Sequence, residues 1–221
     1  MTAVQIIVRG SHSVTLAPQR ATIHATVSAQ GRSAEPVFEK VATALAEVSM
    51  SIEALHHPKR GPVTKYAIDQ VRTGSHRPWN AEGKQLALVH TAAVSITAVF
   101  TEFGALAAWV AAVAGVDGVG IGYLNWELTD ATRLGVERKT RQKAVRDAKR
   151  RAQDYADALD LGTVRVRRIS DPDLGERPME KVFLARSMAA PADGAPQFEL
   201  RPEEITIAAE VEAAFTVPSG A

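Results

Sequence analysis

Six histidines are the side chains of this sequence best suited to metal binding or proton transfer, because imidazole titrates near neutral pH. Metal ligands on a helix or strand favour spacings of i, i+4 or i, i+2, with carboxylates nearby. None of the six pairs in this way; they are His12, His24, His56, His57, His76 and His90. The adjacent pair His56 and His57 falls at a predicted helix end, where imidazolium suits the helix dipole. We therefore predict no metal site.

Nucleophile and cofactor motifs are also missing from the sequence. The chain has no cysteine, which excludes thiolate metal sites, disulfides and cysteine nucleophiles. The glycines from Gly115 to Gly122 follow a predicted helix and precede a strand, the reverse of a dinucleotide-binding loop. No P-loop, H-E-x-x-H or G-x-S-x-G motif occurs. The sequence predicts no catalytic residue, no cofactor and no enzyme, and an enzyme of unknown type is the weakest of three hypotheses.

A predicted hairpin carries the side chains that we single out as an interface or a ligand contact: His76, Arg77, Trp79 and His90. Its two strands, residues 64–73 and 86–100, are joined through a turn at Asn80–Lys84. If the turn centres near Glu82, His90 lies almost opposite residues 75–76. A histidine on an apolar strand face is either a buried residue with one hydrogen-bond partner or a ligand or base. An exposed tryptophan at the tip would be typical of an interface.

The charge distribution does not favour nucleic acid. The formal net charge is +1, so the chain as a whole has no strong preference for polyanions. Basic residues do share one face of a predicted long helix, at Lys139, Lys143, Arg146 and Arg150. A charged stripe opposite an apolar one is usually the solvated face, and no aromatic residues interleave with it. We expect no nucleic-acid partner.

Three amphipathic helices are predicted from apolar spacing. The first has Ser33 as its N-cap and ends before Pro58, with an apolar stripe of Val37, Val41, Leu45, Val48, Ile52 and Leu55. The second is capped by Thr101 and stopped by Gly115. The third runs from about Ala131 to Leu159, and its predicted stripe is Val145, Ala148, Ala152, Tyr155 and Leu159.

Apolar–polar alternation and short apolar runs predict strands at residues 4–8, 20–31, 64–73, 86–100, 119–129, 164–169 and 205–215. The segment 119–129 is apolar on both faces, which favours a central strand. Residues 171–196 lack periodicity and are predicted to form a mobile arm. The order of elements predicts an α+β fold: mostly antiparallel sheet, with one long and two shorter helices on one face.

The length of 221 residues predicts between one and two domains, and we expect a single domain over residues 1–221. No segment approaches the apolar length of a membrane span, and residues 4–8 are too short for a secretory signal. On these grounds we expect no membrane span and a cytoplasmic protein.

Two stretches resemble the SIMPL-domain family. Ile7–Val14, with Ala17-Pro18-Gln19-Arg20-Ala21 leading into a second strand, is similar to the opening of these proteins. The long helix from Ala144 to Leu159, followed by Gly162 and a strand at residues 164–169, also fits, as do the arm and the last strand. His12 and Gln19 depart from the small Gly and the Asp usual there, and the segment 72–85 has no counterpart that we can match.

This resemblance implies a non-enzymatic α+β protein, bacterial in most relatives, that self-assembles into rings or channel-like oligomers. Most bacterial relatives look exported, which differs from our expectation for this chain. The family as a whole has no known catalytic residues, so none is carried over. The leading hypothesis is a self-assembling structural or interaction protein, a homo-oligomer whose other partners are unknown. The alternative is a small-ligand-binding module near the hairpin at residues 72–90, with His76, Trp79 and His90 around one pocket at the sheet edge.

Overall fold

The computed structural model describes residues 4–171 and 200–217, which form an α+β fold of three helices and antiparallel strands. The described chain divides into two compact units. One unit contains β1 (Val4–Leu16), α3 (Asp130–Asp157), β7 (Arg165–Ser170) and β8 (Ile205–Val217). The other unit contains the elements β2 (Arg20–Gly31), α1 (Ala34–Leu55), β3 (Val63–Ile68), β4 (Arg72–His76), β5 (Val89–Phe100), α2 (Phe103–Val113) and β6 (Val119–Glu127).

The single domain that we expect over residues 1–221 stays a prediction, because two compact units can still unfold together. The predicted arm at 171–196 lies outside the described residues, apart from Asp171. None of the described helices combines the length and the apolar content needed to span a membrane.

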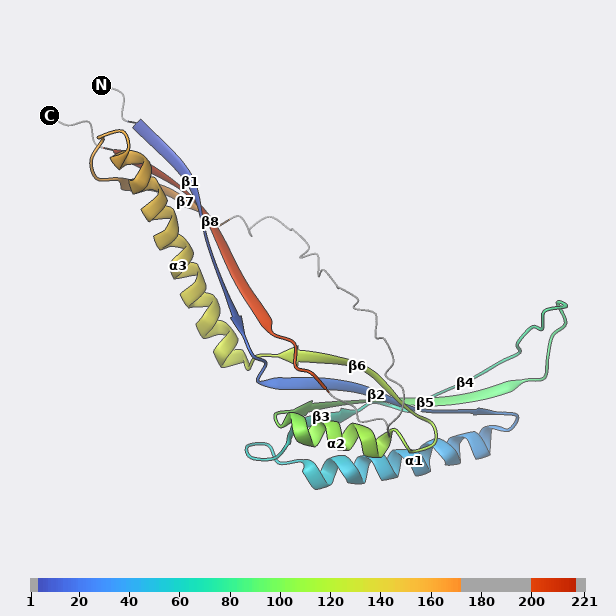
Figure 1. The fold of residues 1–221 in the computed structure, drawn as a ribbon. Helices are drawn as coiled ribbons and strands as arrows, with labels where there is room; N and C mark the ends of the chain where they lie inside the picture. Colours follow the sequence, from blue (N-terminus) through green and yellow to red (C-terminus); the bar gives the residue numbers. More distant parts are fainter. Residues whose placement is uncertain (1–3, 172–199, 218–221) are drawn as a thin grey trace, which may run out of the picture. The chain divides into compact units, whose positions relative to one another are not determined.

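The larger unit is built on an antiparallel sheet in the order β3-β5-β2-β6, with β4 also paired to β5. Helices α1 and α2 lie on one face of this sheet (Figure 1). The predicted bounds of β2 are confirmed, and its alternation has the predicted consequence. Ala21, Ile23, Ala25 and Val27 are buried against the helices, while the polar residues between them lie on the other face.

Helix α1 also follows its predicted stripe closely. Its buried residues are Val37, Val41, Ala44, Val48 and Ile52. The small Ala44 takes the central place that we expected for Leu45, which is only partly buried. Ser33 stands at the N-cap, as predicted, although its side chain makes no capping hydrogen bond.

The strand predicted at 64–73 is in fact two strands. β3 pairs with residues 96–100 of β5 and β4 pairs with residues 89–93, so the same partner strand serves both. Between them the backbone N–H of Asp69 still donates to the carbonyl of Ser95 at 3.0 Å. The partner strand begins at Val89 rather than at Leu86, because residues 86–88 belong to the loop region of the hairpin.

Two local predictions for the larger unit are wrong. β6 is an edge strand, not a central one, and pairs with β2 alone among the strands that the structure describes. The apolar residues of β6 lie on both of its faces. Ile121 and Trp126 pack toward the core, whereas Tyr123 is 62% exposed and stacks on His24. The N-cap of α2 is Glu102, since the hydroxyl of Thr101 instead donates to the carbonyl of Gly61 at 3.3 Å.

In the smaller unit, α3 covers one face of a three-stranded antiparallel sheet with the order β1-β8-β7 (Figure 1). The strands predicted at residues 4–8 and 205–215 are longer than expected. β1 continues through Gly10 to Leu16, and β8 continues to Val217. Its core comes from alternate residues of β8, which are Ile207, Val211, Ala213, Phe215 and Val217, together with Val8 and the helix.

The buried face of α3 agrees with the predicted stripe at Ala148 and Ala152 and differs from it elsewhere. Small side chains make it up: Thr140, Ala144, Ala148, Ala152 and Ala156. Val145, Tyr155 and Leu159 are 37%, 60% and 64% exposed. The reason is the close approach of helix and strand at Gly10, where a Cβ would lie 2.5 Å from the backbone nitrogen of Ala148. Larger side chains on this face would push the helix away from the sheet.

Candidate interaction surface

The predicted hairpin forms, with the predicted pairing of its strands. Ser75 is paired with His90 and His76 with Val89. The neighbouring strand β2 ends where Gly31 pairs with His90. Beyond that point β4 and β5 share one more pair, His76 with Val89, and the two arms of the hairpin extend past the end of β2 (Figure 1).

The tip of the hairpin is closed by a compact turn. The backbone N–H of Lys84 donates to the side-chain oxygen of Asn80 at 2.7 Å, and the N–H of Asn80 donates to the carbonyl of Lys84 at 3.0 Å. Gly83 has a φ of 73°, a left-handed conformation that glycine adopts without strain. Trp79 bridges to Gln85 across the two arms. The tip therefore has a defined backbone on which its side chains are displayed.

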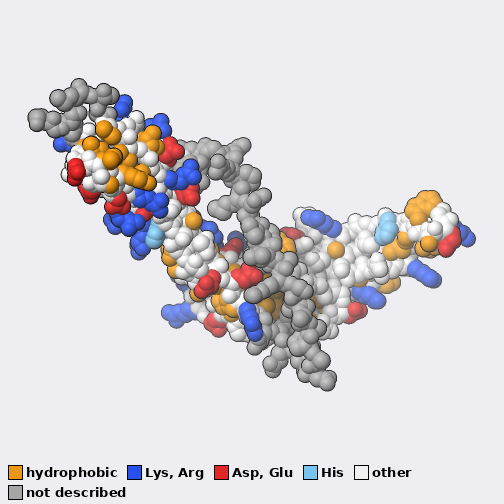
Figure 2. Space-filling model, turned by 45° about the horizontal axis from the view of Figure 1, so that its top comes forward, with side chains coloured by type: hydrophobic (Ala, Val, Ile, Leu, Met, Phe, Trp, Pro, Cys, Tyr) orange, Lys and Arg blue, Asp and Glu red, His pale blue; other side chains and the backbone are white. Residues whose placement is uncertain are grey.

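Large apolar side chains are displayed at this tip. Trp79 is 67% exposed and Leu86 is 44% exposed. Figure 2 shows hydrophobic side chains gathered at the far end of the hairpin. The exposed tryptophan that the sequence predicts is confirmed. Aromatic rings at the wet surface of a fold are typical of binding surfaces, because they bury a large apolar area when a partner arrives.

His90 has a different environment from the other three residues singled out in the sequence. It is half-buried and lines a cavity of about 280 Å³ beneath the start of α1, with Phe38 and Thr73–Ser75 among its neighbours. Paired residues of an antiparallel ladder share a face and adjacent ones alternate, so His76 points to the opposite face from His90. His76 and Arg77 are exposed and line no part of this cavity. The structure thus does not bring His76, Trp79 and His90 together around one pocket.

His24, whose neighbours the sequence did not reveal, lies on the face of the larger sheet opposite the helices. The His24 ring stacks on Tyr123 with ring centroids 4.1 Å apart, and its Nδ1 is 3.3 Å from the Thr97 hydroxyl. The polar face of the alternating strand at 20–31 was visible in the sequence. The missing information was the pairing of that strand with both β5 and β6.

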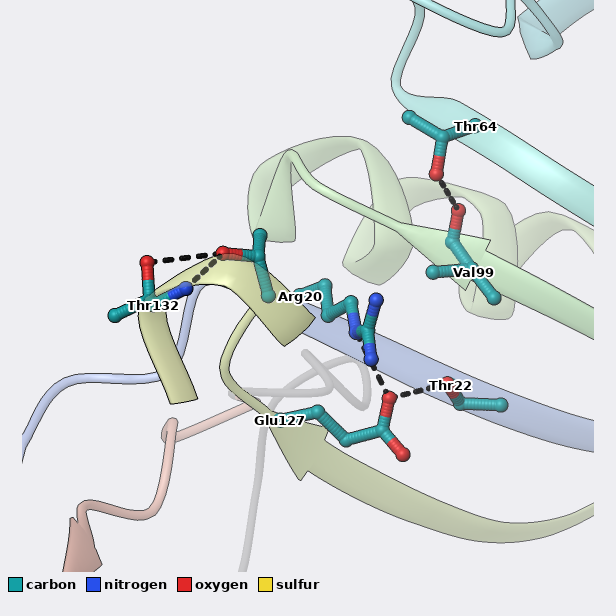
Figure 3. Close-up of polar contacts among 7 residues, drawn as sticks. Arg20, Thr22, Thr64, Val99, Glu127 and Thr132 are labelled. Atoms are coloured by element: carbon teal, nitrogen blue, oxygen red, sulfur yellow. Dashed lines mark hydrogen bonds and ion pairs between the residues drawn. The ribbon is translucent and has the colours of Figure 1, made fainter. Parts of the chain in front are cut away.

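A polar network joins β2 to β6 and consists of Arg20, Thr22 and Glu127 (Figure 3). The Arg20 Nε donates to Glu127 Oε2 at 3.0 Å, and the Thr22 hydroxyl donates to the same oxygen at 3.3 Å. Nearby, the Thr64 hydroxyl donates to the carbonyl of Val99 at 3.4 Å. These contacts join the ends of neighbouring strands, and one oxygen of the Glu127 carboxylate accepts both hydrogen bonds.

A carboxylate with a shifted pKa lies on α3. The carboxylate of Asp147 accepts hydrogen bonds from Arg150 Nη2 at 2.6 Å and from the backbone N–H of Ser11 at 3.2 Å. The Arg150 hydrogen bond is the main cause that lowers the pKa of Asp147, followed by the Ser11 hydrogen bond; Arg151, 2.9 Å away, also contributes. In return, Asp147 raises the pKa of Arg150. This carboxylate joins the helix to β1 and offers no free base.

No cluster of three or more His, Asp or Glu side chains suited to a metal ion occurs in the described parts of the chain. Among curated proteins, none matches this sequence. The model of the SIMPL family, described as a protein of unknown function (DUF541), matches residues 6–215 and therefore nearly the whole chain. The fold agrees with the resemblance drawn from the first strands and the long helix. The chain belongs to the SIMPL family.

Proposed function

We propose that this chain is a non-enzymatic protein that assembles with copies of itself through the β4–β5 hairpin. The observation that carries the proposal is the extension of the hairpin arms beyond the end of β2, with Trp79 exposed at the tip. An isolated two-stranded hairpin is only marginally stable in water. A partner that covers the tip would stabilise its structure as well as bury its apolar side chains.

The side chains at the tip are those that contribute most to interfaces. Tryptophan and arginine are enriched among the residues whose truncation weakens binding most, and here Arg77 and Trp79 are two positions apart. A buried tryptophan contributes about 150–250 Å², whereas a stable interface needs about 800 Å² from each partner. The interface must therefore extend beyond the tip.

The adjoining strand β4 is the natural continuation of this surface. All five of its residues are exposed, and among the described residues it pairs with β5 alone. Its outer edge presents backbone donors and acceptors that a strand from a second copy can pair with. We therefore place the self-association surface along Arg72–His76 and the tip.

The proposal is tested by replacing Trp79 with alanine and measuring solution mass by light scattering coupled to size exclusion. The matched control is Met50→Ala, which removes a side chain that is 64% exposed on α1 of the same unit. We expect Trp79→Ala to shift the mass toward the monomer and Met50→Ala to leave it unchanged. An oligomer of unchanged mass in Trp79→Ala would contradict the proposed function of the hairpin.

The cavity beside His90 favours a second candidate, a small-ligand-binding module. Its volume of about 280 Å³ is close to the lower end of ligand pockets, about 300 Å³. A thermal-shift screen of metabolites and metal ions tests this function, because a specific ligand at 100 times its Kd adds about 2.7 kcal/mol of stability. A shift that disappears in His90→Ala would favour the ligand module; no shift with any compound would count against it.

A further inference from the structure

A second surface feature lies in the smaller unit, between β1 and α3. It is a cavity of about 220 Å³, open to solvent on one side. Its wall is largely apolar, because Val14, Val136 and the carbon chains of the longer side chains form most of it, and the cations Lys139, Lys143 and Arg146 border it together with His12. No carboxylate is among these residues. The cavity is independent of the hairpin, which belongs to the other unit.

The helix and the strand present these cations in one place for simple geometric reasons. Lys139, Lys143 and Arg146 are spaced by four and three residues, so they share one side of α3. His12 lies on the face of β1 that α3 covers, since it is in phase with the buried Val8 and Gly10. Because β1 is an edge strand of its sheet, the cavity remains open beside it.

The acidic residues of α3 near the cavity are engaged elsewhere. Asp147, next to Arg146 in sequence, binds Arg150 at 2.6 Å, Arg151 at 2.9 Å and the backbone N–H of Ser11. Glu137 lies 3.9 Å from Arg141. Within the described residues, Lys139, Lys143 and Arg146 consequently have no carboxylate partner. Figure 2 shows Lys and Arg side chains gathered along the unit that contains α3.

From this juxtaposition we propose that the groove between β1 and α3 binds a small ligand bearing a diphosphate or a similar cluster of phosphate oxygens. The guanidinium of Arg146 offers a planar pair of donors, and the two lysines offer point charges for separate oxygens. Thr140 and Gln142 add neutral hydrogen-bonding groups. The volume is smaller than pockets for drug-sized molecules, which favours a compact anion over a large organic ligand. No Phe, Tyr or Trp side chain lines the groove, so bases of a nucleic-acid strand would lack a large ring to stack on.

The test is titration calorimetry of the full chain with inorganic pyrophosphate at low ionic strength, compared with inorganic phosphate and with a single-stranded oligonucleotide. We expect pyrophosphate to bind more tightly than phosphate, and raised salt to weaken binding. Lys143→Ala and Arg146→Ala should each weaken pyrophosphate binding about tenfold, because each removes a charged hydrogen-bond donor. Lys149→Ala, which removes one positive charge from the same helix outside the groove, should leave affinity nearly unchanged.

Several outcomes would overturn the proposal. One is the absence of pyrophosphate binding to the unmodified chain. Another is an equal loss of affinity in Lys149→Ala and Lys143→Ala, since that would indicate attraction by the general charge of the helix. Binding of the oligonucleotide without binding of pyrophosphate would assign the cations to nucleic acid instead. Circular dichroism spectra of each variant, matching those of the unmodified chain, separate lost binding from lost folding; a variant that fails this check is replaced by glutamine at the same position.

Discussion

Gly10→Ala tests the packing on which the smaller unit depends. A Cβ at this position would lie 2.5 Å from the backbone nitrogen of Ala148 and 2.7 Å from its Cβ, and closer still to the carbonyl oxygen of Ala144. Ordinary van der Waals contacts of a Cβ begin at 3.4 Å. Two of these neighbours are backbone atoms of α3, which no rotamer change can move, so helix and strand must separate by about 1 Å.

The cost of that separation follows from the contacts it weakens. A gap of about 1 Å forfeits up to half of the dispersion energy of each affected contact, and the alanine face of α3 makes many such contacts with β1 and β8. Overpacking in a core costs about 1–3 kcal/mol, and we expect the upper half of this range. With a urea dependence of about 2 kcal/mol per M, the unfolding midpoint of this unit should fall by about 1 M.

Urea unfolding followed by far-ultraviolet circular dichroism measures this change. Gly135→Ala is the matched control, because Gly135 is an exposed residue of α3 with nothing within 4 Å of an added Cβ. Alanine there should raise stability by about 0.5–1 kcal/mol, as it does inside helices generally. Equal stability of Gly10→Ala and the unmodified chain would refute the close packing of α3 on β1.

Two further predictions concern single polar contacts. Asp147→Asn should destabilise the chain above the ordinary carboxyl pKa of 3.8, because the Arg150 and Ser11 hydrogen bonds lower the pKa of this group in the folded state. The stability that the carboxylate contributes is present above pH 3.8 and is lost as pH falls through the lowered pKa. The free energies of unfolding of Asp147→Asn and the unmodified chain should therefore become equal in acid. A constant difference between them down to the lowest pH would contradict this. Ser51→Ala should cost about 1–3 kcal/mol, because it leaves the indole N–H of the buried Trp109, 3.0 Å from the Ser51 hydroxyl, without its acceptor. Thermal unfolding measures this second effect, and an unchanged Tm would show that the hydrogen bond is dispensable.

Much of the larger unit could be predicted because its elements have strong periodicity. Residues 20–31 alternate cleanly, and their strand has the predicted ends. The position of the turn at 80–84 was enough to place His90 opposite Ser75. The alternation of side chains along a strand also puts His76 and His90 on opposite faces of the hairpin. The prediction that they share a pocket did not take this alternation into account.

The errors came from features that hydrophobicity does not measure. The buried face of α3 consists of small residues; Ala148 and Ala152 were predicted, but Ala144 and Ala156 were missed because a search for large apolar residues ranks alanine low. The space for this face is fixed by Gly10, far away in the sequence on β1. The strand at 119–127 looks central because Tyr123 and Trp126 lie on opposite faces, yet Tyr123 covers His24 at the surface. The basic groove depends on the position of β1 against α3, which the sequence alone did not reveal.

Self-association is the central claim, and the solution mass of the unmodified chain tests it most directly. Light scattering coupled to size exclusion, at two protein concentrations, should give a mass that is a multiple of the 23.7 kDa chain. A mass of one chain at both concentrations would contradict the account, and the exposed Trp79 would then need a different partner.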